Sequence, residues 1–106
     1  MLFLVFGLPL TRTVEFRAVL QRGNRVQVPK LVRWEFKLEP SQVLRIRVGR
    51  VSVYGRSEYF FGRMNKDGRI TIPKLTVGLL EDMFEGESLV GKVLEVQLAP
   101  SGSSGS

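Results

Sequence analysis

The sequence RVQVPKL at residues 25–31 returns as RITIPKL at residues 69–75, and this repeat is the strongest indication of the fold. A turn precedes each copy, RGN at residues 22–24 and KDG at residues 66–68. Glycine and asparagine tolerate the positive φ angles that a tight hairpin requires. The proline cannot donate an N–H to a strand ladder, and it suits the first position of a helix. Each copy therefore predicts a hairpin, the end of its second strand and the start of a helix.

Further strands flank both copies. Residues 14–20 alternate between apolar and polar side chains, which is the period of a half-buried strand, and residues 58–64 match them in the second half. Residues 43–48 and 93–98 alternate in the same way and close each half. The expected unit is thus strand–turn–strand–helix–strand, and it occurs twice.

Apolar residues at helical spacing follow each copy of the repeated stretch. The first helix is expected over residues 31–38, with Leu31, Trp34 and Leu38, and also Val32 with Phe36, at helical spacing. The stripe of the second helix is formed by Leu75, Leu79, Leu80, Met83 and Phe84.

Two such units predict one mostly β domain. A single unit has one apolar sheet face that it cannot bury alone, whereas two units related by a pseudo-twofold axis can close a six-stranded β-barrel with short helices. We therefore expect one barrel domain over residues 14–98, with repeat one at 14–54 and repeat two at 58–98. An apolar strand or arm at residues 1–13 precedes it, and a flexible Ser/Gly tail at residues 99–106 follows it.

The residue types in the chain limit the kinds of reaction and binding site that it can support. The chain has no cysteine and no histidine, which excludes disulfides, thiol nucleophiles and the commonest general base and metal ligand. No arrangement of the remaining side chains predicts an activated nucleophile. We therefore expect a non-enzymatic protein with no catalytic residues, no metal site and no cofactor. The absence of cysteine also fits a cytoplasmic protein.

The charge of the chain is unevenly distributed. The net charge is +6, but residues 1–57 hold eleven Lys/Arg against three Asp/Glu, whereas residues 58–106 hold five against seven. The first half therefore has a net charge of +8 and the second of −2. A basic half indicates a polyanionic partner, although a solvated basic surface would give the same count.

The apolar segment at residues 1–10 indicates a second kind of partner. It is too short to span a bilayer as a helix, and it lacks the basic start of a signal peptide, so we expect no membrane association. It is suited to docking on another protein or on a second copy of the chain. Together with the charge asymmetry, it gives the alternative hypothesis of an assembly domain that self-associates through residues 1–10 or binds an acidic protein.

The doubled unit resembles the AbrB-type half-barrel of the cradle-loop barrel group. Residues 67–73, DGRITIP, are close to the AbrB signature, and residues 23–29, GNRVQVP, are a looser copy with Asn24 where glycine is usual. One chain with two halves is similar to double-psi and RIFT barrels, and most similar to archaeal RIFT-barrel proteins of unassigned function. The resemblance implies a cradle-loop barrel, but the sequence leaves RIFT, double-psi and fused swapped-hairpin connectivity open.

The same resemblance implies a DNA-binding surface, because AbrB-like dimers bind DNA through basic residues near the signature. The matching positions are Arg17, Arg22, Arg25, Lys30, Arg63, Lys66, Arg69 and Lys74, and Arg45 and Arg47 extend the patch. The predicted partner is duplex DNA, with binding that weakens steeply as salt rises. For Arg25 and Arg69, a structural role at the turns is an equal alternative. RIFT relatives also include riboflavin and nucleotide enzymes, which makes small-molecule binding a third, weaker hypothesis.

Aromatic residues near arginines give one more candidate. Tyr54, Tyr59 and Phe61 lie close in sequence to Arg50 and Arg56, and such pairs can stack single-stranded bases. Packing on the sheet surface, or cover by the N-terminal arm, is the interpretation that we favour for these residues.

Overall fold

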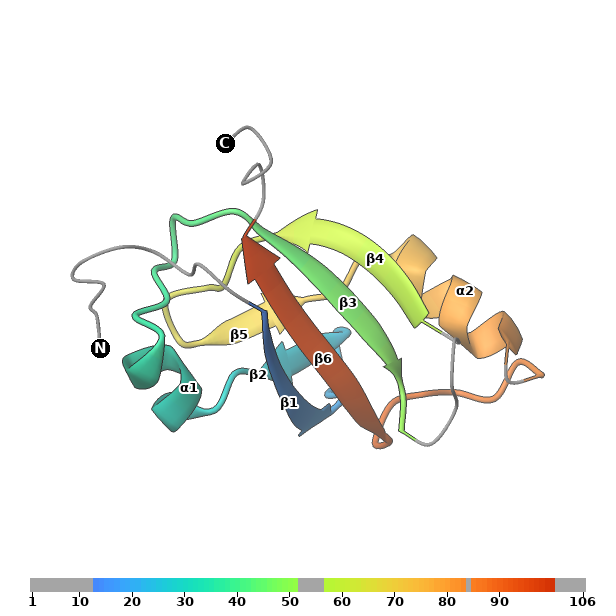
Figure 1. Ribbon diagram of the computed structural model, residues 1–106. Helices are drawn as coiled ribbons and strands as arrows, with labels where there is room; N and C mark the ends of the chain where they lie inside the picture. Colours follow the sequence, from blue (N-terminus) through green and yellow to red (C-terminus); the bar gives the residue numbers. More distant parts are fainter. Residues whose placement is uncertain (1–12, 52–56, 84, 101–106) are drawn as a thin grey trace.

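The computed structural model describes residues 13–51, 57–83 and 85–100. Two ββαβ units follow each other in the order that the sequence predicts (Figure 1). The elements are β1 (Val14–Val19), β2 (Arg25–Gln27), α1 (Lys30–Glu35), β3 (Leu44–Arg50), β4 (Ser57–Gly62), β5 (Arg69–Thr71), α2 (Lys74–Met83) and β6 (Val93–Pro100). The mostly β class is thereby confirmed, and the last strand runs two residues beyond the expected domain end.

The six strands form two antiparallel sheets. Four of them make a sheet in the order β1-β6-β3-β4, and the short strands β2 and β5 make a separate two-stranded ribbon (Figure 1). Within the described residues these sheets do not close into the expected six-stranded barrel. In that part of the chain, the isolated bridges Gln21↔Arg25 and Met64↔Ile70 connect the ribbon to the ends of β1 and β4. The reason is local, since each ribbon strand has three residues and the proline that follows cannot extend a ladder.

The pairing of the strands obeys a twofold symmetry between the units. Exchanging the units converts the β1–β6 pair into the β4–β3 pair, and it leaves the β3–β6 and β2–β5 pairs unchanged. The same exchange relates individual hydrogen bonds at the hairpins. Val28 donates its N–H to the carbonyl of Gly68 at 2.9 Å, and Ile72 donates its N–H to the carbonyl of Asn24 at 2.7 Å. The duplication in the sequence is therefore a duplication of backbone geometry.

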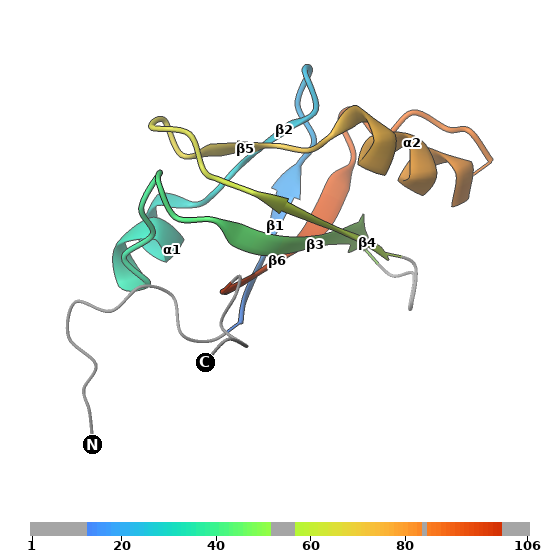
Figure 2. The ribbon, with the colours of Figure 1, turned by 90° about the horizontal axis from the view of Figure 1, so that it is seen from above.

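The core lies between the four-stranded sheet and the ribbon (Figure 2). Alternation along each strand puts every second side chain on the core side. The ribbon contributes Val26, Val28, Ile70 and Ile72, and the sheet contributes Leu44, Ile46, Val48, Leu94, Val96 and Leu98, all of them buried. The outward side chains of the ribbon and of the sheet consequently occupy opposite surfaces of the domain.

The helices are present, but their predicted apolar stripes are only partly correct. Leu31 and Trp34 of α1 are 73% and 68% exposed, and no residue of this helix is buried. Leu75 of α2 is 74% exposed, and this helix instead buries Thr76, Val77 and Leu80. Helical spacing identifies an apolar stripe. Which side of the helix packs on the core depends on the direction of the chain where it leaves the ribbon. Neither helix in the described part of the chain is long and apolar enough to cross a membrane.

Candidate nucleic-acid interface

The outer side of the ribbon carries two arginines. In the ribbon register, Arg25 lies opposite Thr71 and Gln27 lies opposite Arg69. The residues between them point into the core, so these four side chains lie on the outer surface, where they are half-buried or exposed. Arg25 and Arg69 occupy equivalent places in the two repeats and are related by the twofold symmetry.

Two further basic pairs surround the ribbon. Arg22 and Lys66 are exposed residues of the two hairpin turns, at equivalent positions of the repeats. Lys30 and Lys74 are exposed at the first positions of α1 and α2. Because β2 and β5 are antiparallel, these helices begin at opposite ends of the ribbon (Figure 2).

This surface is strongly basic. Residues 21–30 and 65–74, which form the turns, the ribbon and the helix starts, hold six basic residues and one acidic residue. We call the outward side chains of these two segments the ribbon face. The acidic residue is Asp67, whose Oδ2 lies 3.1 Å from Nη1 of Arg69 in an ion pair. Its backbone carbonyl accepts a hydrogen bond from Nε2 of Gln27 at 3.0 Å, which ties the two repeats together.

Arg33, which is not among the residues predicted from the sequence, also lies beside the ribbon face. A Cβ built on Gly68 would be 2.6 Å from Cζ of Arg33, so the guanidinium packs directly on this turn. The contact joins α1 of the first repeat to the turn of the second, 35 residues later in the chain. No pattern in the sequence identifies it, since the equivalent residue of the second repeat is Val77.

The remaining predicted residues lie elsewhere. Arg45, Arg47 and Arg17 are on the outer face of the four-stranded sheet, across the core from the ribbon face. Arg63, just after β4, donates a hydrogen bond from Nε to the carbonyl of Ser41 at 3.2 Å. The structure therefore brings six of the ten candidates together at the ribbon and separates the arginines of the sheet from them.

Those sheet arginines have aromatic neighbours. Arg45 lies opposite Phe61 and Arg47 lies opposite Tyr59 in the β3–β4 register. Cζ of Arg45 is also 5.6 Å from the centre of the Tyr59 ring, within the range of a cation–π contact. We call these four residues the aromatic–arginine patch. Proximity in sequence had associated the aromatic residues with Arg50 and Arg56 instead, and Tyr54 and Arg56 lie outside the described residues.

Ion pairs of Arg17 and Arg50 connect the basic half of the chain to the acidic half. Glu87 lies 2.9 Å from Nζ of Lys92 and 3.0 Å from Nη1 of Arg50. The hydrogen bond from Lys92, followed by that from Arg50, lowers the pKa of the Glu87 carboxyl below its usual value. Arg17 similarly pairs with Glu95 at 3.5 Å. The charge asymmetry along the sequence is thus partly compensated within the fold.

Two of the acidic residues around the end of α2, Glu81 and Glu87, have partners within the chain. Oε2 of Glu81 accepts a hydrogen bond from the N–H of buried Leu89 at 3.0 Å, and Glu87 is engaged as described above. In the part of the chain that the structure describes, no three Asp or Glu residues converge as a metal site would require. Residues 1–10, on which the assembly hypothesis depends, lie outside the described residues.

Comparison with known proteins gives the fold and leaves the activity open. No family model and no curated protein matches the chain. The structure is similar to the solution structure of PHS018 from the archaeon Pyrococcus horikoshii, with a TM-score of 0.63 and 23% sequence identity. The similarity covers 81% of this chain and 88% of that one. It therefore extends over nearly the whole described domain.

Proposed function

We propose that this chain is a non-enzymatic module that binds duplex DNA through the ribbon face. The observation that carries the proposal is the coincidence of three basic pairs with the twofold symmetry. Both repeats have a basic residue at each of three equivalent positions, and all of these positions lie on the ribbon or next to it in the chain. On the outer face of the sheet, in contrast, Arg45 and Arg47 have Glu95 and Gln97 as their equivalents.

The chemistry of this surface matches a phosphate backbone. Lysine and arginine side chains neutralise phosphates and release the counterions condensed on DNA. Two equivalent sets of cations at the two ends of a short ribbon can contact the two strands of one duplex, since a twofold protein surface corresponds to the symmetry of the double helix. The sole acidic residue of the ribbon face, Asp67, is already paired with Arg69 and adds little repulsion.

We further propose that the fold is an open form of the cradle-loop barrel that the sequence resembles. The twofold symmetry of the strand pairing supports this proposal, as do the two single bridges that join the ribbon to the ends of β1 and β4. Nuclear Overhauser contacts between backbone atoms of β1 and β2 would test this proposal. Ladder contacts beyond Gln21 and Arg25 would indicate a closed barrel, and their absence would leave two separate sheets.

The DNA proposal is tested by the salt dependence of binding. If all six basic residues contact phosphates, the slope of log K against log salt is about −5, and affinity falls roughly a thousandfold between about 50 and about 200 mM salt. The double variant Arg22→Ala/Lys66→Ala should reduce that slope by about 2. The matched control, Arg45→Ala/Arg47→Ala, removes the same charge from the other surface and should leave duplex binding nearly unchanged.

Fluorescence anisotropy of a labelled duplex measures these affinities. Trp34 supplies a second signal, because it is the only tryptophan of the chain and lies beside Lys30, whose Nζ is 5.3 Å from its ring centre. Duplex binding at the ribbon face should change its emission. Absence of binding at low salt, or an equal loss in both double variants, would refute the assignment to this face.

A further inference from the structure

The outer face of the four-stranded sheet exposes two aromatic rings that the core does not bury. Tyr59 and Phe61 of the edge strand β4 are 56% and 65% exposed. They share one face because side chains two positions apart in a strand point the same way. Phe60, between them, points into the core and is buried. Burial therefore explains Phe60 but gives no reason for large rings at its two neighbours.

Two arginines of the next strand lie beside these rings. Arg45 is opposite Phe61 and Arg47 is opposite Tyr59. The cation–π contact between Arg45 and Tyr59 places a guanidinium next to an exposed ring. The aromatic–arginine patch thus offers two flat apolar surfaces and two positive charges within one array of neighbouring side chains.

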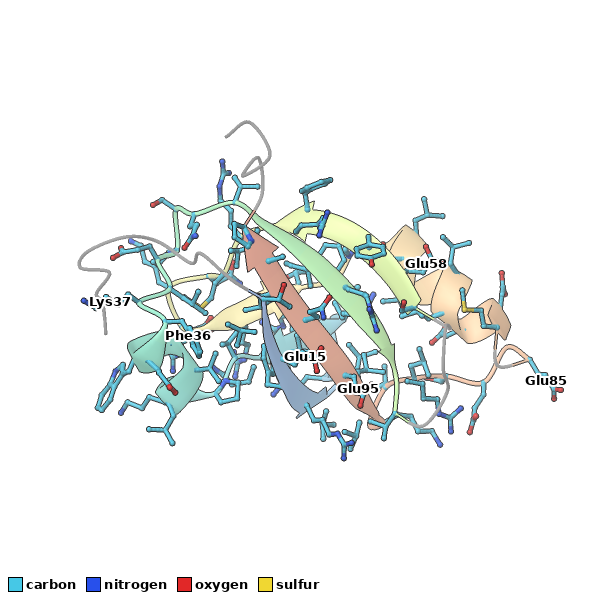
Figure 3. All side chains as sticks on the ribbon, viewed as in Figure 1. Glu15, Phe36, Lys37, Glu58, Glu85 and Glu95 are labelled. Atoms are coloured by element: carbon cyan, nitrogen blue, oxygen red, sulfur yellow. The ribbon has the colours of Figure 1, made fainter. Side chains whose placement is uncertain are left out.

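The acidic residues of this sheet face lie on its other half. Glu15 is on β1 and Glu95 is on β6, as Figure 3 shows. Glu15 accepts a hydrogen bond from Gln97 at 2.8 Å, and Glu95 pairs with Arg17. On the described parts of β3 and β4, the outward positions hold no acidic residue. An anion at the patch would therefore meet positive charge without a facing carboxylate.

We propose that the aromatic–arginine patch binds single-stranded nucleic acid, with bases stacked on Tyr59 and Phe61 and phosphates neutralised by Arg45 and Arg47. Exposed aromatic residues on an antiparallel sheet are a recurrent platform for unpaired bases. The rings favour a single strand because the bases of a duplex are already stacked against one another. This inference does not depend on the proposed function, since the patch and the ribbon face lie on opposite sides of the core (Figure 2).

The test uses a fluorescein-labelled oligothymidylate of about 15 nucleotides, which covers the site size of a typical single-strand platform. Anisotropy is measured with the full chain at about 50 mM salt. Loss of one stacked base weakens binding at least about fivefold, so Tyr59→Ala/Phe61→Ala should raise Kd by about 25-fold or more. Tyr59→Phe keeps a ring and should retain most of the affinity. The matched control Leu31→Ala/Leu75→Ala removes two exposed apolar residues from the helices and should have little effect.

The other variants separate this patch from the ribbon face. Arg45→Ala/Arg47→Ala should weaken oligothymidylate binding, whereas Arg22→Ala/Lys66→Ala should leave most of it intact. Failure of oligothymidylate to bind, or unchanged binding by Tyr59→Ala/Phe61→Ala, would overturn the proposal. So would a light-scattering result in which that variant converts a dimer into a monomer, because the patch would then be an interface between copies. Unchanged thermal unfolding of each variant confirms that the fold is intact.

Discussion

Replacement of Gly68 by alanine should destabilise the protein, and part of the loss should depend on Arg33. Gly68 has a φ of +86°, a backbone conformation that costs other residues about 1–2 kcal/mol. A Cβ at this position would lie 2.6 Å from Cζ, 2.7 Å from Nη1 and 2.8 Å from Nε of Arg33. The guanidinium is the end of a flexible, half-buried side chain, so its displacement should add about 1 kcal/mol, the lower end of the cost of overpacking. The expected destabilisation is therefore about 2–3 kcal/mol in total.

A double-mutant cycle separates the two contributions. In an Arg33→Ala background the steric conflict is gone, and Gly68→Ala should cost only the backbone share of about 1–2 kcal/mol. Urea unfolding of the four proteins gives each free energy from the midpoint, provided that the m-value stays constant. An equal cost of Gly68→Ala in both backgrounds would refute the role assigned to Arg33.

The equivalent position of the first repeat supplies an internal control. Asn24 occupies it with a φ of +59°, a conformation that asparagine tolerates better than alanine does. Asn24→Gly should therefore change the free energy of unfolding by no more than about 1 kcal/mol. A large loss there would show that the turn depends on the asparagine side chain, and it would weaken the comparison between the repeats.

Two further predictions concern the acidic loop after α2. Glu81→Ala removes the acceptor for the N–H of buried Leu89. The unpaired N–H should lower the free energy of unfolding, measured in urea, by about 1–3 kcal/mol. The control Asp82→Ala, on the exposed side of the same helix, should lower it much less. Lys92 lowers the pKa of the Glu87 carboxyl in the folded state. The ion pair therefore stabilises the fold fully at pH values above the pKa that Glu87 has in the unfolded chain. This stabilisation is lost as the pH falls through the lower pKa that Glu87 has in the folded protein. A carboxyl titration by NMR checks the direction of that shift, and Lys92→Met should move the pKa of Glu87 back toward its usual value.

Each of these two predictions has an outcome that contradicts it. Equal effects of Glu81→Ala and Asp82→Ala would show that the hydrogen bond to Leu89 contributes little to stability. A pKa of Glu87 at or above the usual range would show that the pair with Lys92 is not formed in solution. High salt should move the pKa of Glu87 in the same direction as Lys92→Met, because the pair is exposed and screened.

The order of the elements follows from local sequence, and for that reason it could be predicted. Alternation at Val26 and Val28 places both side chains on one face of a strand, and the proline that follows ends the ladder. The helix side that carries Leu31 and Trp34, in contrast, was predicted to face the core but is exposed. A six-residue helix can present any side to its neighbours, and only packing decides between them. The prediction of a closed barrel was wrong for a related reason. Closure needs a long ladder between the ribbon and the sheet, and the length of that ladder depends on the path of the hairpins away from the sheet.

For the candidate site, the basic positions, and the recurrence of three of them in both repeats, can be read from the amino-acid sequence. The sequence also determined which side of its own strand each side chain occupies, because the two-residue period is a property of the strand alone. Which strands share a surface follows from the packing of the whole domain. The β3–β4 register placed Arg45 beside Tyr59 and Phe61, and the ribbon carried Arg25 and Arg69 to the opposite side of the core. These relations depend on pairing between segments distant in the chain, which local periodicity does not encode.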